Sequence, residues 1–462
     1  MTDATATISG AWYELGTIDG PDFRLYRPET PEDPEEELVI DSVHHKSIIP
    51  ILQFARLPIS LPKQGQSSSA TYPFPKTADF AGNTFYRFVT PLITVKNEFQ
   101  DKYQIAFTPN MGHHAVKKVT LLANEIPLVS YGPVVMDQFS ELNLGAGQYE
   151  GYMVGIGNVP AALTFGAYLP PIQIKKRLHE LFFNQKNRPA PQDSFPLAAC
   201  RGNSISVQLD TVESLESLIR IKENKAAVGE AADWQLIDPR GVNLSTIVDV
   251  AGSKGLTMPL PDLWLEAVIV TGEERARLQS ESFDMTYHTI QSFTGQRISA
   301  VRNRQPFNFG GPVRYLAFGA RNQTAADRRD LANYSSNGLD ENAGEDPVKK
   351  VTLWYDNNQR ITGMPGDHFA EAETEMHAAR VPMKVGIHVL PYCYDTTASD
   401  VDGSVNFTKL TTDLELELGE KPSDPNADTP EASQYTFEIN AETIHILRFE
   451  NKSISFPQFT GV

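Results

Sequence analysis

Two short runs place histidines next to each other or next to a carboxylate, His113-His114 and His179-Glu180. Imidazole nitrogens and carboxylate oxygens are common zinc ligands, so these runs are the first places to look for a metal site. Neither run has a further ligand at the spacing of a zinc motif. Histidines that are hydrogen-bonded or solvated are the simpler interpretation, and we predict no metal ligand here.

A second cation site is suggested by the turn that contains Asp400, Asp402 and Gly403. Aligned with the twelve-residue loop of a calcium-binding EF-hand, its first position would be Ala398 and its last Lys409. Neither residue supplies the carboxylate that those positions need. The turn therefore fails as an EF-hand, and no cation site is predicted.

The glycine-rich run from Gly145 to Gly151 nearly matches the fingerprint of a dinucleotide-binding loop. Its spacing is one residue too long, and no strand–helix–strand pattern surrounds it, so we predict a plain loop. The chain also lacks Gly-x-Ser-x-Gly, a P-loop and His-Glu-x-x-His. The sequence thus predicts no catalytic residue, no cofactor-binding residue and no metal ligand, and the protein is not expected to be an enzyme.

Charge and composition narrow the class of protein. The 462 residues carry a formal net charge of −18, and such an acidic surface repels phosphate backbones and anionic lipids, so no direct contact with nucleic acid is expected. No signal peptide is recognised at the N-terminus, and no apolar run approaches the roughly 20 residues that span a bilayer, so no membrane span is expected. The two cysteines, Cys200 and Cys393, stand in apolar surroundings and are predicted to be buried structural thiols, as in a reducing compartment.

Alternation of apolar and polar residues, typical of strands with one buried face, recurs along the chain. It is clearest at 348–355, with a turn at Asn357-Asn358, and at 414–418; residues 363–369 are interpreted as a loop. A final hairpin is predicted at 435–439 and 443–449, with its turn around Asn440. Further strands are predicted at 47–54, 57–61, 84–90, 115–122, 178–183, 204–209, 264–270, 283–288, 313–318 and 385–394.

Helices and loops are predicted in only a few places. A short helix is expected at 136–142, and residues 271–278 are interpreted as a helical linker because Thr271 can cap its N-terminus and Glu273 and Glu274 suit its first turn. Residues 65–70 are a flexible connector, and long polar loops are expected at 222–260, 319–346 and 419–434. Residues 1–40 are acidic but contain aromatic anchors such as Trp12 and Phe23, which predicts an arm that docks on its own domain or on a partner.

A six-residue run occurs twice. Val116-Lys-Lys-Val-Thr-Leu121 returns letter for letter as Val348-Lys-Lys-Val-Thr-Leu353, which is 232 positions later (348 − 116) and so about half the chain away. This offset favours two β domains of one topology in tandem. Two antiparallel domains with long loops at one end suit jelly rolls, although composition alone does not separate these from other sandwiches.

A series of short motifs runs along the chain from end to end. The motifs lie at 12–26, 108–120, 181–184 with 195–199, 264–267 with 273–275, 307–316, 364–369, 386–388, 392–394 and 402–411. Each motif is weak alone, but the ordered set resembles the major capsid proteins of nucleocytoplasmic large DNA viruses, especially iridovirus-like ones. The loops at 222–260 and 319–346 have no counterpart in the resemblance, and Gly310-Gly311 stands where the family usually has a histidine.

The resemblance implies an all-β fold of two tandem eight-stranded antiparallel jelly-roll β-sandwiches, with long surface loops and an N-terminal arm. The expected ranges are 1–40 for the arm, 41–270 for the first jelly roll, 271–281 for the linker and 282–462 for the second jelly roll. It further implies a structural protein of the outer capsid shell of a virion, assembled in the host cytoplasm. Homotrimers of pseudo-hexameric outline would tile an icosahedral capsid and contact minor capsid proteins beneath the shell.

Two other classes of function remain open on the residues alone. A β-sandwich module could bind carbohydrate or a partner through its long loops; Tyr334 is the main aromatic residue in those loops that could serve this purpose. A jelly roll could also house a metal enzyme of the cupin type, although the expected metal ligands were not found above.

Overall fold

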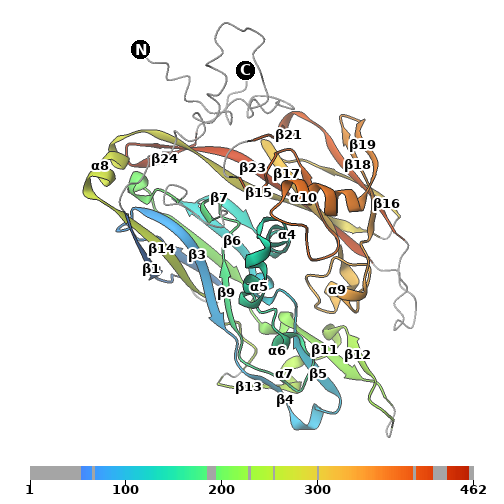
Figure 1. Cartoon of the computed structure of the whole chain (residues 1–462). Coiled ribbons are helices and arrows are strands. Elements are labelled where there is room, and N and C mark those ends of the chain that lie inside the picture. The colour runs from blue at the N-terminus through green and yellow to red at the C-terminus, as the bar shows by residue number, and fades with distance from the viewer. Residues whose placement is uncertain are drawn as a thin grey trace.

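The computed structural model describes residues 54–64, 68–184, 194–226, 230–252, 255–298, 301–398, 402–419 and 434–456. In these ranges the chain forms two β-sandwiches that lie side by side, joined at one end by helix α8, Gly272–Ser280 (Figure 1). Every strand pair described is antiparallel, as predicted. The predicted arm at 1–40 and the strand at 47–53 lie outside the described residues.

The first sandwich is made of two four-stranded sheets. The first sheet has the order β1-β14-β3-β9, and the second has the order β2-β10-β6-β7. The bounds are Phe54–Ser60 for β1, Ser69–Pro73 for β2, Phe80–Val89 for β3, Val116–Ala123 for β6, Ile126–Tyr131 for β7, Gln173–Arg177 for β9, Ile205–Thr211 for β10 and Asp262–Val270 for β14.

The second sandwich repeats this arrangement strand for strand. Its sheets have the orders β15-β23-β17-β20 and β16-β22-β18-β19. Each long strand therefore occupies the same position in its sheet as the corresponding strand of the first sandwich, counted in chain order. This is the expected double jelly roll of eight strands each. The bounds are Phe283–Ile298 for β15, Arg302–Phe307 for β16, Pro312–Asn322 for β17, Val348–Tyr355 for β18, Asn358–Pro365 for β19, Ile387–Pro391 for β20, Thr412–Leu418 for β22 and Tyr435–Glu450 for β23.

The repeated run marks the equivalent strands β6 and β18, and the same offset extends beyond it. Strands β3 and β17 also begin 232 positions apart (312 − 80). The turn between β6 and β7 is made by Asn124 and Glu125, and that between β18 and β19 by Asp356 and Asn357, all at positive φ. Two consecutive residues at positive φ form a two-residue hairpin turn, whose twist matches the twist of the strands on either side. The offset therefore holds for β3, β6 and β7, since β7 and β19 also begin 232 positions apart (358 − 126). The second turn lies one residue earlier than predicted.

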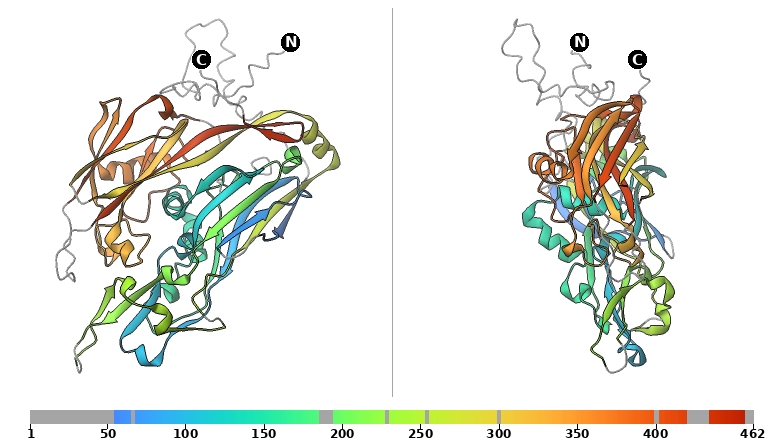
Figure 2. Two further views of the ribbon diagram at one scale, coloured as in Figure 1. Left: turned by 180° about the vertical axis from the view of Figure 1, so that it is seen from behind. Right: turned by 90° about the vertical axis from the view of Figure 1, so that its right-hand side faces the viewer.

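Connections between the long strands carry most of the remaining elements, many of them at the end of the first sandwich away from α8 (Figure 2). Strands β4 and β5 follow β3; helices α4, α5 and α6 follow β7; and β11, β12, α7 and β13 lie between β10 and β14. In the second sandwich α9 follows β17, and the π-helix η11 and helix α10 follow β19. The bounds are Ile93–Val95 (β4), Tyr103–Phe107 (β5), Met111–His114 (α3), Pro133–Asn143 (α4), Ala146–Gly155 (α5), Pro160–Leu163 (α6), Tyr168–Leu169 (β8), Ile219–Asn224 (β11), Trp234–Ile237 (β12), Leu244–Ile247 (α7), Val248–Val250 (β13), Gln323–Asp327 (α9), His368–Ala372 (η11), Glu373–His377 (α10), Val405–Asn406 (β21) and Ser453–Ser455 (β24).

The linker helix is confirmed in detail. The Thr271 side chain accepts a hydrogen bond from the Glu274 backbone N–H, and Glu273 and Glu274 lie in the first turn. Arg275 then forms a two-pronged ion pair with buried Asp79, which fixes the helix on the first sandwich. The helix is thus anchored rather than free. The residue ranges of the two domains stay a prediction.

Some predicted elements are wrong. The run 178–183 is not a strand, because the strand ends at Arg177 and Phe182–Asn184 form a 3₁₀ helix, η5. Its apolar residues are buried all the same, and Phe182 packs on Tyr287 of the second sandwich. Residues 363–369 are not a loop, since β19 runs to Pro365 and η11 begins at His368. Ser69 and Ala70, placed in a flexible connector, begin β2.

The predicted turn at Asn440 is wrong too, because β23 runs unbroken from Tyr435 to Glu450. Asn tolerates the backbone of a turn, but here its side-chain amide donates to Gln138 Oε1 at 2.8 Å, so a buried partner satisfies it within a strand. Tyr334, expected as an exposed loop aromatic, is completely buried. The cue for a loop-based binding module is therefore lost.

Candidate functional site

The two runs His113-His114 and His179-Glu180 lie close together in the first sandwich, where Tyr152 packs on both His113 and His179. We use the name polar cluster for a set of side chains brought together by α3, α4, α5 and strand β9 with the residues after it (Figure 1). Apart from Tyr152, which is half-buried, its members are almost completely buried. The polar cluster consists of Asn110, His113, His114, Asp137, Tyr152, Lys176, His179 and Glu180.

The Asp137 carboxylate is at the centre of one half of the polar cluster. His113 Nδ1 lies 2.6 Å from Asp137 Oδ1, and Asn110 Nδ2 donates to the same oxygen at 2.7 Å. His114 Nε2 is 2.9 Å from Oδ2. Burial alone would raise the pKa of Asp137, but the two histidines outweigh it and hold the pKa well below its usual range. Asp137 is therefore a buried carboxylate that helix α4 brings to the histidines of α3.

The other half of the polar cluster is an ion pair. Lys176 Nζ donates to both oxygens of Glu180, at 2.7 and 2.9 Å, and also lies over the Tyr152 ring. Burial raises the pKa of a carboxyl group, but His179 and Lys176 lower the pKa of Glu180 to about 2. Burial lowers the pKa of His179 to about 3, so this imidazole is neutral near pH 7. The pair joins β9 to the residues that follow it.

The polar cluster is built to hold structure. Its carboxylates are engaged by histidines, Asn110 and Lys176, and their almost complete burial leaves substrate no access. In the described ranges, no three His, Cys, Asp or Glu side chains are arranged to hold a metal ion. Paired buried groups of this kind fix a unique arrangement of the helices around them.

The other two candidate sites, the glycine-rich run and the turn with Asp402, are also parts of the fold. Residues 146–155 form helix α5, so the predicted loop at Gly145–Gly151 is wrong. Glycine weakens an isolated helix, but packing on β9 compensates: a Cβ on Gly155 would meet the Lys175 carbonyl oxygen at 2.7 Å. Asp402 is buried, with Oδ1 3.6 Å from Arg314 Nη2. Asp400 lies outside the described residues. Both cysteines are buried and free, as predicted, and burial raises the pKa of each to about 12.

A further set of polar contacts, which the sequence analysis did not predict, lies where the two sandwiches meet. Helix α4 of the first sandwich supplies Glu141, which is 1% exposed at its side chain. Its carboxylate accepts from Arg380 Nη2 at 2.6 Å, from the Met383 backbone N–H at 3.0 Å and from Tyr149 Oη at 2.6 Å. The Arg380 guanidinium also stacks 3.6 Å from the Tyr149 ring centre. One carboxylate thus ties helix α4 to the segment between α10 and β20.

A second network crosses the junction a few residues along α4. Asn143 Nδ2 donates to Tyr315 Oη at 3.2 Å, and Tyr315 Oη donates to Glu442 at 2.8 Å. Glu442 accepts from Arg314 Nη1 at 2.7 Å, and Arg314 is the largest fully buried side chain in the described residues. Burial alone would raise the pKa of Glu442, but His288 and Arg314 outweigh it and lower that pKa.

Aromatic packing closes the junction near α8. Phe182 lies 5.5 Å from Tyr287, and Phe195 lies 6.0 Å from Phe449, measured between ring centres. Strands β15 and β23 are long enough to extend from the second sandwich over the first, where these rings meet (Figure 1). Aromatic pairs at such distances contribute roughly 0.5–1.5 kcal/mol beyond their area burial.

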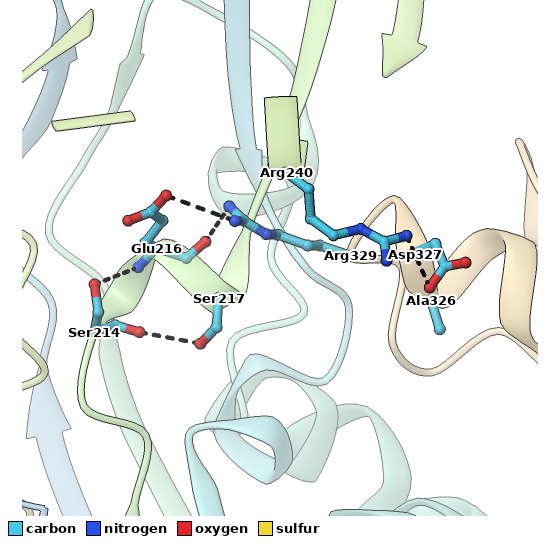
Figure 3. Close-up of a pocket in the computed structure, with 7 residues that line it drawn as sticks. All are labelled: Ser214, Glu216, Ser217, Arg240, Ala326, Asp327 and Arg329. Carbon is cyan, nitrogen blue, oxygen red and sulfur yellow. Dashed lines mark hydrogen bonds and ion pairs between the residues drawn. The ribbon is translucent and has the colours of Figure 1, made fainter. Parts of the chain in front are cut away.

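The far end of the junction contains a cavity of about 450 Å³ (Figure 3). Arg329 donates to the Glu216 carbonyl oxygen, and its Nη2 lies 3.7 Å from the Glu216 carboxylate. Arg240 Nη2 lies 3.1 Å from Asp327 Oδ1. Both arginines are thus paired with carboxylates across the two sandwiches, so this cavity is a bridged seam rather than an anion site. Its lining residues are Ser214, Glu216, Ser217, Arg240, Ala326, Asp327 and Arg329.

Taken along its length, the junction is one continuous interface. Buried apolar residues of both sandwiches, such as Phe139, Tyr315 and Phe449, belong to a single core. The sandwiches therefore hold a fixed relative orientation. Two polar side chains on one face of β23, Asn440 and Glu442, take part in the contacts that cross this interface.

Comparison with known proteins agrees with this architecture. The family described as large eukaryotic DNA virus major capsid protein matches residues 274–454. The major capsid protein of Simulium iridescent virus is 23% identical over 98% of this chain and 97% of its own length. That of Frog virus 3 is 24% identical, over 89% and 92%.

Over almost its whole length, the chain is similar to major capsid proteins of large eukaryotic DNA viruses.

Solved structures of such capsid proteins share the fold. PBCV-1 VP54 superposes with a TM-score of 0.65 at 12% identity, covering 88% of this chain and 97% of that one. The Faustovirus major capsid protein gives 0.65 at 9% identity, covering 89% and 94%. The expected structural role in a viral capsid is confirmed, and nothing favours the carbohydrate- or partner-binding alternative. No helix in the described parts of this capsid protein is long and apolar enough to cross a membrane.

Proposed function

We propose that three copies of this capsid protein associate into a ring of nearly sixfold outline, and that these trimers tile an icosahedral shell. One observation carries the proposal: two sandwiches with the same strand order are held in a fixed orientation by a continuous junction. Three copies then present six similar blocks around one axis. Closed cyclic symmetry is the usual form of such homo-oligomers.

We infer the orientation of the subunit in the shell from where the two ends of the described chain lie. The described chain begins at Phe54, paired with Val270 beside α8, and β24 near its end lies beside Gly202, whose N–H donates to the Lys452 carbonyl. Strands β4, β12 and β13 lie at the opposite end (Figure 1). We place the first end toward the interior, where the N-terminal arm contacts minor capsid proteins, and the second end outward. The role is geometric, without catalysis or direct contact with nucleic acid, in the outer capsid shell of a virion assembled in the host cytoplasm.

The test is the mass and outline of the assembled unit. Light scattering after size exclusion should give about 154 kDa, three times 51.2 kDa, and averaged electron micrographs should show six lobes. The same unit should be released from disassembled shells. A monomer in both preparations would overturn the proposal.

A further inference from the structure

Two helices, α4 and α5, connect the polar cluster of the first sandwich with the junction to the second, and we call them the clamp (Figure 1). Each of them carries one residue in each network. On α4 these are Asp137, which pairs with the histidines of α3, and Glu141, which accepts from Arg380 at 2.6 Å. On α5 they are Tyr152, in the polar cluster, and Tyr149, which donates to Glu141. A shift of either helix on the polar cluster therefore disturbs contacts across the junction.

The clamp is held on the polar cluster by a histidine in its neutral form. Neutral His113 donates from Nδ1 to the Asp137 carboxylate at 2.6 Å, and its Nε2 accepts from the Tyr152 hydroxyl at 2.7 Å. Burial lowers the pKa of His113 although Asp137 opposes this, so the neutral form is the stable one near pH 7. A proton on Nε2 would remove the acceptor of the Tyr152 hydroxyl and so weaken the hold on α5.

His179 supplies a second neutral ring on the same helix. It packs edge-to-face on Tyr152, with 5.3 Å between the ring centres. Neither of its ring nitrogens has a hydrogen-bond partner in the described ranges, and Glu180 Oε1, 3.4 Å from Nε2, already accepts from Lys176. A protonated His179 would thus be a buried cation beside Lys176 with no acceptor of its own, which is costly as long as the site stays closed.

The charges around both imidazoles oppose further protons in the closed state. Lys176 and Arg177 repel a positive charge on His179. The carboxylates of Asp137 and Glu180 are already engaged, and Lys384 of the second sandwich also acts on Asp137. The titratable groups that face the two imidazoles are His114 of α3, Asp137 of α4, Tyr152 of α5, Lys176 and Arg177 of β9, Glu180 after β9, Tyr86 of β3 and Tyr131 of β7.

We infer that α4 and α5 form an acid-sensitive clamp: proton uptake by His113 and His179 releases the two helices and, with them, contacts that fix one sandwich on the other. Once the helices move away, both imidazoles reach water and titrate near pH 6.5, as exposed histidines do. The released state then binds more protons than the closed state, so a fall in pH below 6.5 favours release. This device belongs to the single chain and does not depend on the proposed trimer.

Backbone amides at the junction report release directly. The Ala379 N–H donates to the Leu142 carbonyl oxygen at 2.9 Å and the Met383 N–H to Glu141 Oε2 at 3.0 Å, so both acceptors are on α4. Hydrogen exchange of the full-length protein at pH 6.5 and pH 5, corrected for the intrinsic pH dependence of exchange, measures how often these contacts open. Proton uptake by His179 alone raises the opening constant about 16-fold over this range, and uptake by His113 raises it further.

The reference for global unfolding is strand β10, which is paired on both sides within the first sandwich, and its amides should keep their protection. The test variant carries His113→Gln and His179→Gln, which do not titrate, so its junction amides should open equally at both pH values. The matched control is His445→Gln, a partly buried histidine on β23 outside the polar cluster, which should keep the acid response. If the double variant does not fold, His179→Gln alone should reduce the acid response by about 16-fold.

Three results would overturn the inference. The first is equal protection of the Ala379 and Met383 amides at the two pH values in the unaltered protein. The second is an acid response that persists in full when the histidines are replaced. The third is loss of protection in β10 together with the junction, because that would be unfolding of the whole first sandwich rather than release of two helices.

Discussion

The sheet β15-β23-β17-β20 has an outer surface that lies against the first sandwich, and we call it the covered face. The equivalent surface of the sheet β1-β14-β3-β9, the open face, has no such cover among the described residues. At Ala317 the covered face is small and buried beneath the neighbouring sandwich, while 232 positions earlier the open face carries the larger Phe85, partly exposed next to Trp264. The strand order is identical, so topology does not decide which surface is buried. The difference shows that specialisation after the repeat lies in outward side chains, and four predictions test it, in order of expected effect.

The largest effect is expected from a carboxylate placed at the two matched positions. Ala317→Asp puts an unpaired charge inside the junction, which should cost more than about 4 kcal/mol of unfolding free energy. Phe85→Asp, half-exposed and beside Lys175, should cost less than about 2 kcal/mol. Urea unfolding followed by tryptophan fluorescence measures both. Equal costs would show that the two faces are equally buried in the monomer.

Next is the charge network of the covered face. Among the described residues, Glu442→Gln leaves the more distant Asp402 as the remaining carboxylate partner of the buried Arg314 guanidinium, so a loss of about 3 kcal/mol is expected. The matched control is Glu415→Gln on β22, which is only partly buried and should change stability by less than about 0.5 kcal/mol. If the two variants unfold at the same urea concentration, the network does not stabilise the junction.

The polar cluster predicts a pH dependence in the first sandwich. Because the pKa of His179 is about 3 when folded and 6.5 when exposed, the unfolded chain binds more protons between these values. Its contribution to stability is complete above pH 6.5 and decreases as the pH falls, by roughly 1.4 kcal/mol per unit. From pH 6.5 to 5 the loss should be about 2 kcal/mol.

The control for this dependence is His179→Gln, which should flatten the slope. His445 in the second sandwich, whose pKa burial lowers to about 4, is retained in both proteins and contributes equally. Denaturant titrations at several pH values measure the slope. An unchanged slope would mean that His179 does not titrate on unfolding.

The smallest effect is expected at an ion pair on the outer sheet of the second sandwich. Arg302 and Glu417 lie 3.1 Å apart, but the Arg302 side chain is 69% exposed. Solvent screens such pairs, so Glu417→Gln should change the unfolding free energy by less than about 0.5 kcal/mol. Thermal unfolding in low and high salt would measure it, and a change above 1 kcal/mol would show that the outer sheets depend on charge more than we infer.

Strands with one buried face were predictable because alternation is a local signal. The repeat at Val116 and Val348 and the cap at Thr271 were equally local, and all three are confirmed. Elements that depend on the junction were not predictable. The apolar run at 178–183 is buried without forming a strand, with Phe182 packed on Tyr287 of the second sandwich. Asn440 is held in a strand by Gln138, 302 residues away. No sequence window contains both partners.

The polar cluster illustrates the same limit. His113 and His179 could be identified as reactive residue types, but their partners Asp137 and Tyr152 come from helices predicted only in part, or as loop. Glycines at 147 and 151 indicate a loop by propensity, but they lie in a helix that packs on β9 near its C-terminal end, at Gly155. Which polar residues meet therefore depended on tertiary structure.

The order of the strands also determines when the first sandwich can fold during synthesis of the chain. In the first sandwich β1 pairs with β14, and its first residue, Phe54, is opposite Val270, 216 residues later (270 − 54). At roughly 5–20 residues per second, a ribosome needs about 10–40 seconds to supply the missing strand. During that interval β14 is missing, so the edges of β1 and β3 are unpaired and the Phe85 ring lacks its partner Trp264. A nascent chain of this protein thus exposes unpaired strand edges for a long time before the first sandwich is complete, and it is prone to aggregate during that time.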